Sequence, residues 1–155
     1  MHIPGHLATA LAQHRLLTLS GQTGQVTLTP LLIAGLLPDV VDKAVGYVFC
    51  LMPNGRHYAH NIFSLLGLSL VVMLLWGRAA GLAWFVGYLG HLLADSNSFV
   101  PWFFPVKRYQ FYAGRLKFKP LQFFKEVIFL AVVLVIYYLT RPPGQTNIAQ
   151  PAVDV

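Results

Sequence analysis

Apolar residues dominate this chain so strongly that they limit what it can fold into. Of its 155 residues, 56% are hydrophobic and 10% are charged, and only five are Asp or Glu. The mean hydropathy of +0.60 is too high for an ordinary soluble domain. A carboxylate beside a membrane segment is costly, and such a residue generally has a partner or a function. The composition therefore predicts a membrane protein and directs attention to its few acidic residues.

The net charge limits which partners the chain can bind, and the cysteine content limits which covalent and metal sites it can form. The formal net charge is +6, and a basic chain can indicate a nucleic-acid partner. In so apolar a chain anionic lipid headgroups explain the charge better, so we expect membrane lipids and no nucleic acid as partners. The single cysteine, Cys50, excludes an intrachain disulfide and a paired-cysteine metal site.

Glycine, proline and polar residues divide the apolar sequence into segments that we expect to be helices. One of these is expected to end near Pro38 and to be followed by a helix at the membrane interface. The segments are shorter than the ~20 residues of a full membrane span, but polar flanks can extend them and a compact bundle can thin the bilayer. The expected helices cover residues 7–19, 29–37, 40–52, 61–76, 79–94 and 121–139.

The segments predict an all-α fold, namely a small multi-helix integral membrane bundle with a polar metal-site end. Residues 1–140 form a single membrane-embedded domain in this prediction, and residues 141–155 form a flexible C-terminal tail. The segment between the last two helices is rich in aromatic, proline and basic residues. Basic and apolar residues alternate near its end, so a short β-hairpin is predicted near 107–119.

Alternating helix directions bring the polar residues of the chain to one end of the predicted bundle. His91 and Asp95 are four residues apart, and Asp39 and Asp42 are three apart, so each pair shares one helix face. His and Asp are the ligand types of hydrolytic metal sites, and a cation stabilises a charge at an apolar boundary. The candidate metal ligands are His6, Asp39, Asp42, His60, His91 and Asp95.

Most of the Lys and Arg residues fall at the same end under this topology. The opposite end carries only Arg15, Arg78 and Arg141. Because cytoplasmic segments are enriched in Lys and Arg, we expect a multi-pass protein whose polar end faces the cytoplasm. The basic residues of the polar end are Lys43, Arg56, Lys107, Arg108, Arg115, Lys117, Lys119 and Lys125.

The candidate ligands also have interpretations that need no metal. Asp39 could cap a helix, and His91 and Asp95 could form a hydrogen-bonded pair that fixes helix packing. His60 could anchor the chain at the membrane interface, and Arg56 could bind a lipid headgroup. These separate interpretations leave the shared location of the residues unexplained.

Four motifs together resemble a bacterial family. They are Pro-Gly-His6, Leu-Leu-Pro-Asp39-x-x-Asp42, Arg56-x-x-x-His60 and Gly-Tyr-Leu-Gly-His91-Leu-Leu-x-Asp95. The family consists of small membrane-bound proteins identified as predicted metal-dependent hydrolases, some of them under LexA control. The resemblance covers residues 1–140 and implies a bacterial inner-membrane protein with hydrolase activity.

The chain departs from the family pattern in two places. The family usually has His-Arg-Gly-x-Thr-His-Ser, whereas a glycine precedes Arg56 here and His57 stands at the Gly place. His57 either replaces the missing ligand or lies at the membrane interface. Ala59 and Asn61 stand at the Thr and Ser places, and Ser96-Asn97-Ser98 replaces a Thr-Pro-Gly that usually follows the last motif.

The order His, Asp, His and HxxxD is also similar, more distantly, to zinc-dependent phospholipases C and P1-type nucleases. That similarity implies metal-binding roles for His6, Asp39, His60, His91 and Asp95. The later ligands of those enzymes have no counterpart, since Glu126 has no His four residues before it. We therefore expect one or two divalent ions, with Zn²⁺ as the metal, and no three-zinc site.

The resulting hypothesis is a membrane-bound, metal-dependent hydrolase that cleaves phosphoester or other ester bonds in a lipid or a soluble small molecule. The ion is held by His60, His91 and Asp95 in this hypothesis. Either Asp39 or Asp42 completes its ligands, and the other acts as a base or orients water. Arg56 binds a phosphate or carboxylate group.

Two non-catalytic functions remain open at this stage. A membrane protein with a structural metal site would surround the ion with protein ligands and leave no position for water. A metal or proton carrier would use the same ligands but would also need polar residues through the bundle. Residues 62–76 offer few of these besides Ser64 and Ser69, so transport is the less favoured hypothesis.

Overall fold

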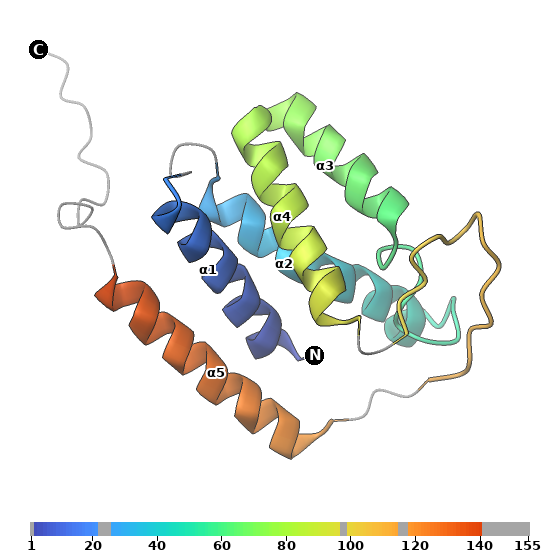
Figure 1. The fold of residues 1–155 in the computed structure, drawn as a ribbon. Coiled ribbons are helices and arrows are strands. Elements are labelled where there is room, and N and C mark those ends of the chain that lie inside the picture. The colour runs from blue at the N-terminus through green and yellow to red at the C-terminus, as the bar shows by residue number, and fades with distance from the viewer. Residues whose placement is uncertain (1, 22–25, 97–98, 115–117, 141–155) are drawn as a thin grey trace, which may run out of the picture.

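The computed structural model describes residues 2–21, 26–96, 99–114 and 118–140, which form helices joined by loops (Figure 1). No strand occurs in these residues, and the prediction of an all-α fold is confirmed. The tail predicted at 141–155 lies outside the described residues. The elements are α1 (Ile3–Leu19), α2 (Leu28–Lys43), the π-helical segment η1 (Ala44–Val48), α3 (Ile62–Trp76), α4 (Arg78–Ala94) and α5 (Pro120–Leu139).

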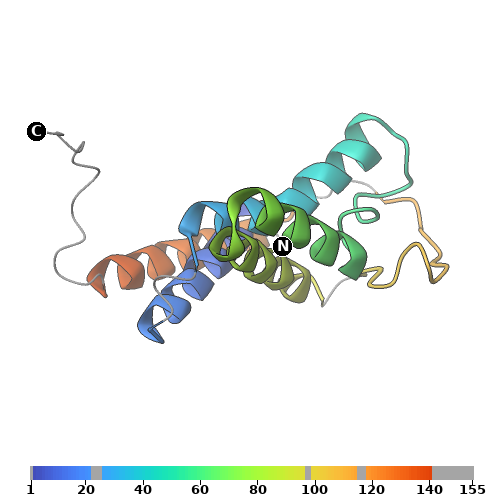
Figure 2. The same cartoon turned by 90° about the horizontal axis from the view of Figure 1, so that it is seen from above.

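The centre of the bundle consists of α2, α3 and α4, and α1 and α5 lie along its side (Figures 1 and 2). α4 packs on both α2 and α3, while α1 contacts α2, α4 and α5. Glycine permits a close approach of α4 to α2, because a Cβ atom at Gly87 would lie 2.2 Å from the carbonyl oxygen of Leu31. The buried core between these helices includes Ala34, Leu65, Tyr88, Leu92 and Val100.

Among the described helices, α5 is the one that is long and apolar enough to cross a membrane, and α3 is apolar but shorter. Large apolar side chains on both helices point outward, and Leu74 of α3 is 75% exposed. Length and composition therefore support one membrane span, and the prediction of several spans stays a prediction. α5 joins the bundle through α1 alone within the described part of the chain.

Polar side chains join α5 to α1 along a contact that we call the α1–α5 seam. The carboxylate of Glu126 accepts hydrogen bonds from the backbone nitrogens of His2, at 2.7 Å, and Gly5, at 3.3 Å. Near the other end of both helices, Arg15 Nε donates to Thr140 Oγ1 at 2.6 Å. The two helices therefore run parallel, and a negative charge lies at the N-terminus of α1, where it is favourable.

The helix that was expected to end near Pro38 continues through this residue to the end of α2, and residues 40–52 are not a separate interfacial helix. A proline inside a helix removes the backbone hydrogen bond to the carbonyl four residues before it, here that of Ala34. The long contact between α2 and α4 offsets this loss. The helical stretch ends instead after η1, where Cys50 adopts a positive φ of 52°.

No strand is found among the described residues of the segment 107–119, where a short β-hairpin was expected. The backbone nitrogen of Gly114 donates to the carbonyl oxygen of Pro53 at 2.9 Å. The segment thus uses its backbone to bind the loop that precedes α3, and alternation of side chains alone could not reveal that partner. Residues 115–117, the centre of the alternating pattern, lie outside the described residues.

Candidate metal centre

The structure brings all six candidate ligand residues together at one end of the bundle, where α1 begins and α2 and α4 end. Each of the six is at most 3% exposed. They come from four parts of the chain that are distant in sequence. α1 supplies His6, α2 supplies Asp39 and Asp42, the loop before α3 supplies His60, α4 supplies His91, and Asp95 follows α4 directly.

Four of these residues form the inner group. His6, Asp39, His91 and Asp95 each offer a ligand atom, and these atoms all lie within 4.8 Å of one another. His6 Nε2 is 3.6 Å from an oxygen of Asp39 and 3.7 Å from an oxygen of Asp95. The rings of His6 and His91 stack with centroids 3.9 Å apart. Buried imidazole and carboxylate groups at this spacing suit a divalent cation.

His60 faces the same group. Its Nε2 atom lies 3.2 Å from His91 Nε2, 3.6 Å from Asp39 Oδ1 and 3.8 Å from Asp95 Oδ2. The Nδ1 atoms of both rings point away from the centre, to Asp42 at 2.8 Å for His60 and to the Gly35 carbonyl at 2.8 Å for His91.

The hydrogen bonds at Nδ1 determine what each imidazole presents at Nε2. The carbonyl oxygen of Gly35 only accepts, so Nδ1 of His91 carries the proton and Nε2 of the neutral ring presents a lone pair. Metal-bound histidines are commonly oriented in this way by a carbonyl or carboxylate. Two Nε2 lone pairs 3.2 Å apart repel each other unless a proton or a metal ion binds one of them.

Asp42 lies behind His60 and has both oxygens engaged. Besides His60, it accepts hydrogen bonds from the backbone nitrogens of His57, at 2.5 Å, and Ala59, at 2.9 Å. It is not one of the four residues of the inner group. The geometry therefore makes Asp42 an orienting residue for His60 and for the loop that carries it.

Carboxylates also control the protonation of His60. Burial opposes a charged ring, but the adjacent carboxylates of Asp39 and Asp42 outweigh it and raise the pKa of His60 above its ordinary value. A metal ion therefore competes with a proton for His60.

Two cations stand at the edge of the inner group. Lys43 Nζ is bound to Asp39 Oδ2, and Arg56 Nη2 lies 2.6 Å from Asp95 Oδ2. Arg56 also donates through Nη1 to the carbonyl oxygen of Phe99 at 3.4 Å. Lys43 was expected only as a basic residue of the polar end, although its position four residues after Asp39 was a usable signal for an ion pair.

His57 does not belong to the inner group. Its ring is fully buried and lies against Phe111, with centroids 4.8 Å apart. Neither ring nitrogen has a hydrogen-bond partner within the described part of the chain, and burial lowers the pKa of His57. His57 thus lies against the segment between α4 and α5, beside the site, and its ring nitrogens are not among the clustered ligand atoms.

Two metal-free interpretations, those of Asp39 and His60, are now excluded, and Arg56 is placed in the site. Asp39 lies inside α2 and cannot cap a helix start. His60 is fully buried and is not an interfacial anchor. Arg56 binds Asp95 and a backbone carbonyl, so its guanidinium is anchored in the site.

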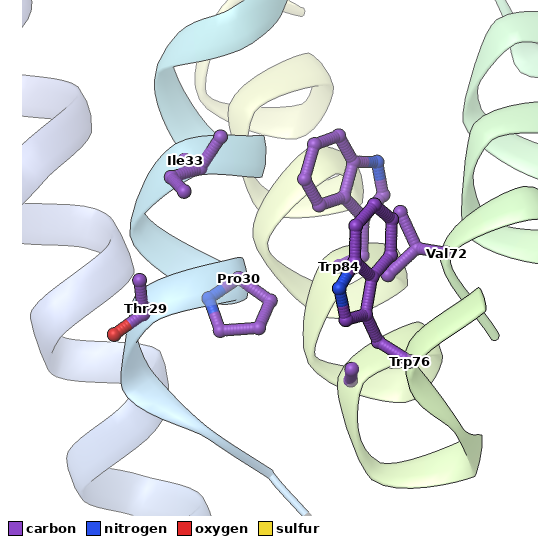
Figure 3. A pocket seen from close by; sticks show the side chains of 7 residues that line it. Thr29, Pro30, Ile33, Val72, Trp76 and Trp84 are labelled. Carbon is purple, nitrogen blue, oxygen red and sulfur yellow. The ribbon is translucent and has the colours of Figure 1, made fainter.

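A separate cavity of about 320 Å³ lies at the opposite end of the bundle (Figure 3). It is bordered by the start of α2 and by the turn between α3 and α4, it is open on one side, and its walls are almost entirely apolar. No residue that lines it is titratable, so it offers no acid, base or metal ligand. The lining residues are Thr29, Pro30, Ile33, Val72, Trp76, Ala80 and Trp84.

Comparison with curated proteins found no match, and comparison with solved structures found none either. A family model described as YdjM inner membrane protein matches residues 1–148. The matched range includes every described helix and all six candidate ligand residues. It also confirms the expectation of a bacterial inner-membrane family. The chain therefore belongs to the YdjM inner membrane protein family.

Proposed function

We propose that this inner-membrane protein is a metal-dependent hydrolase with Zn²⁺ as its ion. One observation carries the proposal. The Nε2 atoms of His60 and His91 lie 3.2 Å apart, each ring is oriented through Nδ1, and both rings face the buried carboxylates of Asp39 and Asp95. Packing alone does not require two imidazoles to be aimed at one point beside two carboxylates.

Unpaired polar atoms in the site support the fit of a divalent ion. Within the described residues, both ring nitrogens of His6 and Oδ1 of Asp39 are buried without a hydrogen-bond partner. A buried polar atom without a partner costs about 1–3 kcal/mol, so several of them in one place need an explanation. A metal ion bound by imidazole and carboxylate groups supplies the missing partner.

The chemistry that such an ion supplies is activation of water for hydrolysis near neutral pH. The residues of the chain then have distinct roles. His6, His60 and His91 bind the ion, and Asp42 fixes the orientation of His60. Asp39 and Asp95 are the carboxylates placed to bind the ion or to accept a proton from water.

The α1–α5 seam supports more than one membrane-embedded helix. α1 has 17 residues, which corresponds to a length of about 26 Å. Because α1 and α5 run parallel and are joined near both ends, a bilayer crossed by α5 also surrounds α1. Described basic residues are concentrated at the metal-centre end, so that end faces the cytoplasm by the positive-inside rule.

A structural metal site is the alternative that one observation favours. All six candidate ligand residues are nearly inaccessible, as expected when protein groups enclose an ion. Against this, the side chains of Lys43 and Arg56, which contact the inner carboxylates, are 37% and 24% exposed. The centre is therefore close to the surface on the side of these two cations, where a substrate can approach.

The test is metal analysis of the purified full-length protein. Wild type and His14→Ala, whose ring lies on α1 away from the centre, should retain the ion. His91→Ala and Asp95→Ala should lose it, and equal metal content in all four proteins would remove the ligand assignment. Phospholipid, phosphomonoester and nucleotide substrates are then screened with and without a chelator. Chelator-sensitive turnover supports the hydrolase, and tight metal binding without turnover supports the structural site.

A further inference from the structure

Two partly exposed cations neutralise the two buried carboxylates of the inner group, and we call Lys43 and Arg56 the cationic rim. The side chains of Asp39 and Asp95 are only 5% and 1% exposed, whereas those of Lys43 and Arg56 reach the surface. The two cations are close in space as well as in role. Gly55 packs against the stem of Lys43, where an added Cβ atom would lie 3.1 Å from Lys43 Cγ, and Arg56 is the next residue.

A divalent ion adds two positive charges beside the cationic rim. Asp39 and Asp95 each pair with one cation of the rim, and Asp42 faces His60. An unbalanced charge in a buried site is costly. An anionic substrate would offset the added positive charge, whereas a neutral one would not.

The rim residues differ in how firmly they are held. Arg56 has a second acceptor, the Phe99 carbonyl, so its planar guanidinium stays in place when Asp95 turns toward an ion. Lys43 has a flexible stem and is bound to Asp39. An ion that draws the charge of Asp39 therefore frees the Lys43 ammonium for another anion.

We propose, on the basis of the function proposed above, that Lys43 and Arg56 form a binding site for the phosphate group of an anionic phosphoester. A guanidinium binds two phosphate oxygens in a fork, and an ammonium binds a third as a point charge. The phosphate can belong to a lipid headgroup or to a soluble molecule. The adjoining loop carries exposed Phe103, Val106 and Lys107, which suit a lipid surface.

The experiment uses full-length protein in an uncharged maltoside detergent, loaded with Zn²⁺ and titrated calorimetrically with inorganic phosphate. Phosphate should bind the zinc-loaded wild type and not the metal-free form. Lys43→Gln should weaken phosphate binding by about tenfold or more while the zinc content stays that of wild type. Lys125→Gln, an exposed charge on α5, is the matched control and should bind phosphate normally.

Each other outcome overturns a defined part of the proposal. Equal phosphate affinity in Lys43→Gln and Lys125→Gln removes Lys43 from the phosphate site. Loss of zinc from Lys43→Gln shows that Lys43 only positions Asp39, and this result also contradicts the role of the cationic rim in phosphate binding. A wild type that binds no zinc overturns the metal centre together with the rim, whereas normal zinc binding with no Lys43 effect overturns the rim alone.

A second arm identifies the source of the phosphate. The titration is repeated in nanodiscs of phosphatidylglycerol. Phosphate binding that is weaker there than in maltoside, with no such difference for Lys43→Gln, assigns the rim to a lipid headgroup. Unchanged phosphate affinity assigns it to a soluble phosphoester, and either result supports the phosphate site.

Discussion

The α1–α5 seam and the metal centre both bury polar side chains, and they satisfy them differently. In the seam, Glu126 accepts hydrogen bonds from the backbone at the start of α1, and Arg15 donates to Thr140. In the metal centre, among the described residues, His6 has no hydrogen-bond partner at either ring nitrogen, and Oδ1 of Asp39 has none. The polar groups of the seam are satisfied by each other, whereas the described residues leave these atoms of the centre without a hydrogen-bond partner.

This difference distinguishes buried polar residues that hold the fold together from buried polar residues that serve a ligand. A satisfied polar contact orients two helices and needs nothing further. An unsatisfied buried cluster weakens the fold unless a ligand binds it, and natural proteins tolerate such a cost mainly at functional sites. Variants in the two regions should therefore respond differently to added metal.

The largest effect is expected from His60→Ala. The variant removes an imidazole that faces both inner carboxylates and His91. Metal affinity should fall by more than about 100-fold, beyond the 10- to 100-fold usual for residues that only orient a ligand. Metal titration with a competing chromophoric chelator measures this. An affinity within threefold of wild type would show that His60 is not a ligand.

A smaller loss is expected from Asp42→Asn. The amide keeps one oxygen, which can still accept from the backbone nitrogen of Ala59, but its amino group offers no acceptor to the backbone nitrogen of His57 or to His60 Nδ1. Metal affinity should fall about 10- to 100-fold because the imidazole is less firmly oriented and less basic. The same chelator competition measures the loss, and circular dichroism checks that the helices remain. A complete loss equal to that of His60→Ala would make Asp42 a direct ligand.

Much of this centre was accessible from sequence because helical geometry is local. The spacing of His91 and Asp95, and of Asp39 and Asp42, depends only on the helical repeat, and up-and-down connection of the helices brings those ends together. The end of α2 was predicted too early, at Pro38. The hydrogen bond that this proline removes from the helix is outweighed by packing of α2 on α4, which is a tertiary effect that the local sequence does not show.

Other features could not be predicted because their partners are distant in the sequence. Glu126 lies 121 residues from Gly5, whose backbone nitrogen it binds, and no local pattern marks that pairing. The Gly35 carbonyl orients His91 across 56 residues, and a backbone acceptor carries no sequence signal at all. Lys43 is a different case, since its spacing from Asp39 was visible and only its role was overlooked.

In the seam, Glu126→Gln should affect stability and leave the metal centre functional. The substitution removes the negative charge at the N-terminus of α1 and weakens the hydrogen bonds to His2 and Gly5. The expected destabilisation is about 1–2 kcal/mol. It should lower the thermal midpoint in detergent equally with and without zinc. Lys125→Gln, which replaces the neighbouring exposed charge, should leave the midpoint unchanged.

The smallest change in the thermal midpoint of the metal-free protein is expected from His6→Leu. The direction of this change distinguishes the metal centre from the seam. Leu cannot make hydrogen bonds, but the ring nitrogens of His6 make none within the described structure, so little is lost. Removing unsatisfied buried polar atoms can even stabilise a fold. The metal-free midpoint should therefore stay within a few degrees of wild type or rise. Added zinc, which should raise the wild-type midpoint by preferential binding to the folded state, should raise that of the variant much less.

A clear fall of the metal-free midpoint in His6→Leu, comparable to that of Glu126→Gln, would mean that His6 is as well satisfied as the seam. The distinction between the two regions would then be lost. A variant that keeps the metal-free midpoint and loses the zinc-dependent rise would instead show that the polarity of His6 serves the ion and not the fold. Measuring the thermal midpoint of His6→Leu with and without zinc separates these outcomes. If His6 is only a metal ligand, the variant differs from wild type only when zinc is present.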